Sequence, residues 1–149
     1  MAPAFTLPST QGRAVSLRDF RGQRVVLYFY PRDDTPGCTT EACEFRDRLP
    51  AFTAQDAVIL GISPDAPASH QRFTEKFTLP FTLLSDEDHR VCRAYGVWVK
   101  KSMYGRTYMG VARTTVVIGP TGRIERLYHQ VKPAGHADEV FAALPVPAR

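Results

Sequence analysis

Residues 24–30 read RVVLYFY, a continuous apolar run of β-branched and aromatic side chains that Pro31 ends. Such a run predicts a central strand that is buried on both faces of a sheet. Residues 57–63 (AVILGIS) stop at Pro64 and predict a second strand of the same kind. Two buried strands separated by a helix-sized segment favour a parallel pair, and we expect a right-handed crossover between them.

Further strands and helices complete the pattern around these two. Residues 114–118 and 124–130 predict a hairpin, because the turn sequence Gly-Pro-Thr-Gly joins them. Helical spacing of apolar residues fills the gaps, over residues 39–52, 67–77, 86–95 and 137–144. This order predicts an α/β fold with a mixed central sheet flanked by helices, in a single domain spanning residues 1–149.

Composition and length exclude several classes of function. The chain has 149 residues and a net charge of +4, and the charges alternate in sign without a block typical of a nucleic-acid tail. No stretch approaches the ~20 apolar residues that a membrane helix needs. The first residues lack the basic and apolar regions of a secretory signal. We therefore expect a cytoplasmic protein with neither a nucleic-acid nor a membrane partner.

The segment after the first strand carries the chemistry. Pro36-Gly37 leads the chain into the next helix, so Cys38 falls in its first turn. Unpaired N–H groups and the helix dipole stabilise an anion there, and the thiolate is the reactive form of cysteine. Thr35 can place a hydroxyl beside the sulfur. The same residues, taken alone, also permit a capping Thr35 and an inert buried Cys38.

The wider segment resembles a known family. Residues 29–47 (FYPRDDTPGCTTEACEFRD) contain Pro-x-x-x-Thr-x-x-Cys, with Pro31, Thr35 and Cys38 at the spacing of a peroxiredoxin active site. The run looks most like the branch called peroxiredoxin Q or bacterioferritin comigratory protein. Residues 95–118 resemble that branch's approach to its active-site arginine, here Arg113. The resemblance covers nearly the whole chain and implies a thioredoxin-like fold and a thiol peroxidase without cofactor or metal.

The resemblance also implies roles for individual residues. Cys38 would attack the O–O bond of hydrogen peroxide or an organic hydroperoxide and become a sulfenic acid. Thr35 and Arg113 would hold the thiolate and polarise the peroxide. Pro31 would shield the sulfenic acid from water, and Glu41 would orient Arg113 through an ion pair.

Two further cysteines are candidates for the resolving step. The resemblance implies that Cys43, five residues after Cys38, forms an intramolecular disulfide with it, which a thioredoxin-like reductant reopens. Cys92 lies on a later predicted helix and is the alternative resolving residue; its other interpretation is a buried, inert thiol. The branch is often monomeric, and we expect a monomer.

Two other functions compete with a peroxidase. A thioredoxin-type disulfide oxidoreductase requires Cys-x-x-Cys, but four residues separate Cys38 from Cys43. A metal-binding module could combine the three cysteines with a histidine, although no pair has metal-ligand spacing. The histidines, which we interpret as surface residues, are His70, His89, His129 and His136. The aromatic and methionine-rich residues 98–109 predict either a lining for organic peroxides or a packed or covering loop.

Overall fold

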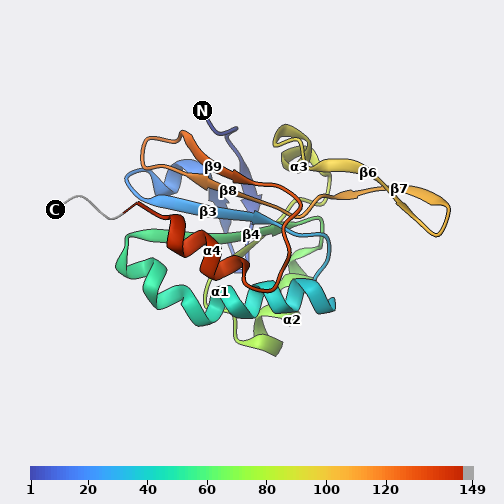
Figure 1. The fold of residues 1–149 in the computed structure, drawn as a ribbon, viewed down its shortest axis with the longest axis horizontal. Helices are drawn as coiled ribbons and strands as arrows, with labels where there is room; N and C mark the ends of the chain where they lie inside the picture. The colour runs from blue at the N-terminus through green and yellow to red at the C-terminus, as the bar shows by residue number, and fades with distance from the viewer. Residues whose placement is uncertain (146–149) are drawn as a thin grey trace.

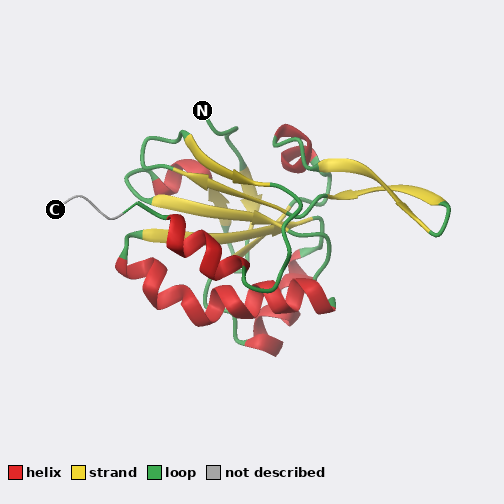
Figure 2. Ribbon diagram, in the orientation of Figure 1, coloured by secondary structure: helices red, strands yellow, loops and turns green. Residues whose placement is uncertain are grey.

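The computed structural model describes residues 1–145 and contains a mixed sheet with helices on both faces (Figures 1 and 2). The strands are β1 (Thr6–Pro8), β2 (Ala14–Ser16), β3 (Arg24–Phe29), β4 (Ala57–Ser63), β5 (Thr82–Ser85), β6 (Trp98–Met103), β7 (Arg106–Val111), β8 (Thr114–Ile118) and β9 (Ile124–Tyr128). The helices are the 3-10 turn η1 (Leu17–Phe20), α1 (Pro36–Ala54), α2 (Pro67–Phe77), α3 (Arg90–Ala94) and α4 (His136–Ala143).

The central sheet has five strands in the order β5-β4-β3-β8-β9. Strands β3, β4 and β5 run parallel, whereas β8 and β9 are antiparallel to their neighbours. The predicted α/β class, the two central strands and the hairpin are therefore confirmed. Because β3 lies in the middle of the sheet, its carboxyl end opens at the centre of one edge, where ligands favour binding in open α/β sheets.

Each face of the sheet carries its own core. Alternate residues of β3 point to opposite faces: Val26 and Tyr28 pack under α1, α2 and α4, whereas Val25 and Leu27 pack against β1, β2 and α3. Figure 1 shows α1 and α4 beside each other across the first face.

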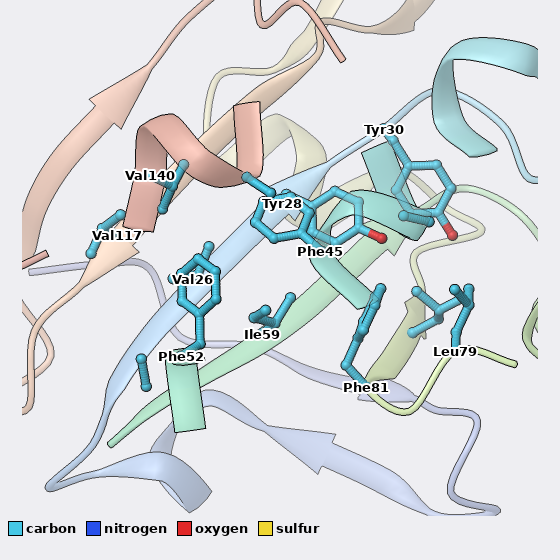
Figure 3. Packing of buried hydrophobic residues seen from close by; sticks show 14 of the residues in the cluster. Val26, Tyr28, Tyr30, Phe45, Phe52, Ile59, Leu79, Phe81, Val117 and Val140 are labelled. Carbon is cyan, nitrogen blue, oxygen red and sulfur yellow. The ribbon is translucent and has the colours of Figure 1, made fainter. Parts of the chain in front are cut away.

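Aromatic side chains fix α1 on the sheet (Figure 3). The Phe45 ring stacks on Tyr28 at 4.9 Å between centroids and contacts Phe52 at 6.0 Å. Phe52 in turn meets Phe141 of α4 edge-on at 5.4 Å. All but Phe141 are fully buried, and burial of each such side chain contributes about 1.5–3 kcal/mol. These contacts hold the middle of α1 against the sheet and α4.

Several boundaries differ from those predicted. Helix α1 begins three residues earlier than expected, because Pro36 suits the first helical turn. The predicted helix over residues 86–95 is wrong in its first half. His89 has a left-handed backbone (φ 63°), and the buried Asp86 carboxylate accepts hydrogen bonds from the amides of Val91 and Cys92, so that only Arg90–Ala94 is helical. Strand β9 ends before Gln130, which has φ 49°.

Residues 98–111 form a hairpin, not a packed or covering loop. Strands β6 and β7 pair antiparallel and project away from the body of the molecule (Figure 1). Tyr104 and Gly105 have φ values of 53° and 77°, as a two-residue type I′ turn requires. The hairpin joins the body beside Arg113.

Candidate active site

Cys38 is the third residue of α1, just beyond the carboxyl end of β3. Its side chain is buried, with 1% exposed. The Thr39 N–H donates to the Thr35 carbonyl, and the amides before it have no earlier helical carbonyl to bind. The sulfur therefore lies at the positive end of the helix dipole.

Arg113 connects the sulfur to a buried carboxylate. It follows β7, and its Nη2 lies 3.3 Å from Cys38 Sγ while its Nη1 donates to Glu41 Oε1 at 2.7 Å. Burial opposes the charge of the guanidinium, but the neighbouring Cys38 and Glu41 outweigh it and raise the pKa of Arg113 above its usual value. The arginine therefore stays a cation beside the sulfur.

A glycine makes room for this arginine, a role that no pattern in the sequence predicts. A Cβ added to Gly37 would lie 3.2 Å from Arg113 Nη2 and 3.4 Å from the Pro133 ring. The neighbours would then have to shift by a few tenths of an ångström. The absence of a side chain at Gly37 thus allows the guanidinium to lie close against the first turn of α1.

Glu41 is buried beneath the arginine. Burial raises the pKa of its carboxyl to about 7, against the opposing effect of Arg113. Oε1 accepts from Arg113, whereas Oε2 has no hydrogen-bond partner among the described residues. One oxygen of the carboxylate is thus paired and the other is buried without a partner, and the nearby Glu44 adds to the rise in the pKa of Glu41.

This raised pKa gives a testable dependence of stability on pH. The folded protein binds a proton at Glu41 more tightly than the unfolded chain does. The stability this provides is fully present below pH 4.5 and is lost as the pH rises toward 7, by about 3 kcal/mol in all. Glu41→Gln removes the titration. We therefore expect the difference in free energy of unfolding, Glu41→Gln minus unmodified protein, to increase by about 2–3 kcal/mol as the pH rises from 5 to 8.

Urea unfolding at both pH values measures this difference. Glu75→Gln, at an exposed position on α2, is the control for the loss of a carboxylate as such. A Glu41→Gln difference that is flat across this range would contradict a carboxyl that titrates near neutrality.

The other predicted residues take different positions. The Thr35 hydroxyl donates to the Arg32 carbonyl at 3.0 Å, and within residues 1–145 no hydrogen bond joins it to Cys38. It also makes no side-chain cap for α1. Pro31 lies two residues after the end of β3 and is half-buried at the start of the loop. Cys43 is a half-buried free thiol on α1.

Cys92 lies on the opposite face of the sheet. It belongs to the core beneath α3, whereas Cys38 belongs to the core beneath α1. Burial, together with Asp86, raises the pKa of the Cys92 thiol far above its usual range, which keeps it protonated and unreactive. Because the sheet separates these cysteines, the three thiols do not form one metal site.

Two histidines are buried, contrary to the expectation of surface residues. His136 Nε2 and Thr115 Oγ1 share a hydrogen bond of 2.7 Å, and burial lowers the pKa of the His136 imidazole. His70 is fully buried in α2 and lies beside the loop that precedes Cys38. A lone histidine on a helix carries no sequence signal of burial when its partner is distant in the chain.

A buried thiol at a helix N-terminus, covered by an arginine at the carboxyl edge of a mixed sheet, defines a thiol enzyme of the thioredoxin-like class.

None of the helices among residues 1–145 is long and apolar enough to cross a membrane.

Comparisons with known proteins identify the family. Residues 1–127 match the AhpC/TSA family. The chain is 50% identical to putative peroxiredoxin bcp of Coxiella burnetii, over 96% of this chain and 95% of that protein. It is 46% identical to peroxiredoxin Bcp of Bacillus subtilis, over 96% and 91% of the two chains. The structure of the bacterioferritin comigratory protein of Xanthomonas campestris superimposes with a TM-score of 0.89 at 42% identity, covering 93% of this chain and 88% of that one.

The chain belongs to the AhpC/TSA family and, within it, to the peroxiredoxin Q or Bcp branch. It is therefore a peroxiredoxin with a thioredoxin-like fold, a thiol-dependent peroxidase.

Proposed function

We propose that Cys38 is the residue that reduces the peroxide. The observation that carries this proposal is the contact of 3.3 Å between Arg113 Nη2 and Cys38 Sγ, at the N-terminus of α1. The Cys38 thiolate attacks one peroxide oxygen, so that an S–O bond forms as the O–O bond breaks. The departing oxygen takes up a proton and leaves as water or an alcohol, and Cys38 becomes a sulfenic acid.

Arg113 stabilises the charge that moves during this step. Its guanidinium lies beside the sulfur and donates to the peroxide oxygens as they gain negative charge. Glu41 holds the other side of the guanidinium and fixes its plane. In this proposal Thr35 and Pro31 line the approach to the sulfur, with the Thr35 hydroxyl turning from Arg32 toward bound peroxide.

The substrates that we propose are hydrogen peroxide and organic hydroperoxides. The Xanthomonas campestris relative was studied for alkyl peroxide reduction, which supports the organic class. An assay that follows peroxide and a thioredoxin-like dithiol together tests the activity as a whole. We expect peroxide to be consumed only while the dithiol is supplied. Consumption of peroxide without oxidation of the dithiol would exclude it.

We infer that Cys43 completes the cycle. Its thiolate attacks the Cys38 sulfenic sulfur, the S–S bond forms and water leaves. A thioredoxin-like dithiol then reduces the disulfide by exchange and restores both thiols. The alternative resolving residue, Cys92, is disfavoured by its place across the sheet and by the raised pKa of its thiol.

Disulfide formation requires α1 to unwind. Cys38 and Cys43 lie on one continuous helix, in which residues five apart have Cα atoms roughly 8–9 Å apart. A disulfide rarely spans more than about 7 Å between Cα atoms. The Phe45 ring, stacked on Tyr28, fixes the next turn. We therefore expect unwinding of the first turns only.

Peptide mapping and hydrogen exchange measure this prediction together. After one equivalent of hydrogen peroxide, mapping should find Cys38 joined to Cys43. Amides of residues 39–43 should exchange faster than in the reduced protein, while those near Phe52 remain protected. Cys92→Ser is the control and should give the same results. A Cys38–Cys92 link, with Cys43→Ser still turning over on thioredoxin, would make Cys92 the resolving residue.

We also infer that the chain forms one domain, of which residues 146–149 lie outside the described part, and that it acts as a monomer in the cytoplasm. The proposed reductant supports this location, because thioredoxin-like proteins keep thiols reduced in that compartment. Size-exclusion chromatography with light scattering tests the monomer.

A further inference from the structure

A buried polar cluster lies beside the loop that leads to Cys38. The Asp33 carboxylate accepts hydrogen bonds from three side chains, although only 8% of the residue is exposed. Tyr30 Oη donates to Oδ1 at 2.5 Å, and Ser69 Oγ donates to Oδ2 at 2.8 Å. His70 Nδ1 lies 2.7 Å from the same Oδ2. The peroxidase cycle proposed above uses none of these residues.

Both ring nitrogens of His70 are hydrogen-bonded. Its Nε2 lies 2.9 Å from the Leu84 carbonyl, which can only accept, so Nε2 donates. Its Nδ1 lies 2.7 Å from Asp33 Oδ2, and a proton lies between the two atoms. This fully buried contact is the Asp33–His70 ion pair.

This ion pair ties the loop to the body of the fold. Asp33 lies five residues before Cys38, and its N–H donates to Asp65 Oδ2 at 2.8 Å. Ser63 Oγ, at the end of β4, holds the same oxygen at 2.7 Å. The loop is therefore bound to three elements other than α1. It contacts the end of β4 through Asp65 and Ser63, α2 through His70, and β5 through the bond of His70 to the Leu84 carbonyl.

A metal ion is the other interpretation of this cluster. Ligand atoms of Asp33, Asp65 and His70 lie within 4.8 Å of one another. Each of them, however, already takes part in a hydrogen bond that accounts for its position. A proton shared through His70 therefore accounts for the cluster without a metal.

We propose that His70 is a positioning residue for the reaction of Cys38, acting through Asp33 on the loop 31–35. The proposal rests on the peroxidase function proposed above. The first turns of α1 must unwind and re-form in each cycle, and they need a fixed start from which Cys38 returns to Arg113. Buried polar groups that are hydrogen-bonded on every side are costly to separate, so the loop has a single position. Unwinding is thereby confined to the residues that follow it.

Two single variants and their combination test this role. His70→Gln and Asp33→Asn are close in size to the native residues, and each disrupts the hydrogen bond between Nδ1 and Oδ2. Stopped-flow measurement should find Cys38 oxidation by hydrogen peroxide slowed about tenfold or more in each, because displacement of a reacting group by about 1 Å can cost a hundredfold. The subsequent formation of the Cys38–Cys43 disulfide should be unchanged or faster, since a released loop unwinds more easily. The double variant should be no slower than the slower single variant.

The controls separate positioning from general stability. His129→Gln changes an exposed histidine and should react like the unmodified protein. Oxidation at the native rate in His70→Gln would overturn the proposal. The proposal would also be overturned if Cys38 oxidation and disulfide formation slowed equally, in proportion to a fall in the urea midpoint of unfolding. That result would indicate a structural role only. If His70→Gln does not fold, Ser69→Ala removes one donor to Asp33 and should slow oxidation about threefold; an unchanged rate overturns the proposal.

Failure of the peroxidase function and failure of the ion pair give different results. An unmodified protein that does not react with peroxide would end the proposed function itself, before any variant is compared. Zinc that binds Cys38→Ser tightly but does not bind His70→Gln would overturn the ion pair and identify a metal site in its place.

Discussion

Cys38→Ser is expected to abolish peroxide consumption, even in the presence of excess dithiol. Serine keeps the size of the side chain and its place at the N-terminus of α1. Its hydroxyl, unlike a thiol, is not ionised near neutral pH, so the nucleophile is lost while the fold remains. Loss of absorbance by hydrogen peroxide, followed with the dithiol in excess, measures the effect.

The other cysteines give the matched controls. Cys92→Ser should consume peroxide at the native rate, because Cys92 is buried on the opposite face of the sheet. Cys43→Ser should still undergo a single oxidation of Cys38. Near-native turnover by Cys38→Ser would mean that another group is the nucleophile.

Arg113→Lys is expected to slow oxidation of Cys38 about a hundredfold or more, the usual cost of losing one oriented donor to a developing charge. The guanidinium contacts Cys38 and Glu41 at the same time through two nitrogens. An ammonium is a single point donor and cannot hold both contacts in one plane. The substitution therefore preserves the charge and removes the geometry.

The rate constant of oxidation, measured by stopped flow, is the readout. Arg123→Lys, at an exposed position in the turn before β9, is the control and should match the native rate. If Arg113→Lys also reacted at the native rate, positive charge alone would suffice and the fork of the guanidinium would have no catalytic part.

The elements that could be predicted from the sequence have a strong local pattern. Residues 24–29 and 57–63 are buried on both faces, so nearly every side chain in them is apolar or small and the run is visible without partners. The hairpin β6–β7 is exposed along most of its length and shows no apolar alternation. Its only local indication is the Tyr104-Gly105 turn. Strand β5 is too short for a clear pattern.

The candidate active site likewise contains residues that a local sequence pattern predicts and residues that only packing brings together. The spacing of Thr35 and Cys38 along one segment is visible in the sequence, and its resemblance to a family points to the distant Arg113. The close approach of Gly37 to Arg113 depends on packing between elements 76 positions apart. The ion pair of Asp33 with His70 joins residues 37 positions apart, and neither residue type indicates burial by itself.

Trapping of the sulfenic acid identifies the cysteine that reduces the peroxide. In Cys43→Ser the oxidised Cys38 has no resolving partner on α1, so dimedone added with one equivalent of hydrogen peroxide should react with the sulfenic acid. Peptide mass mapping should then find one adduct per chain, on Cys38. Peroxide consumed with the adduct on Cys92, or with no adduct on Cys38, would contradict the assignment of Cys38 as the residue that reduces the peroxide.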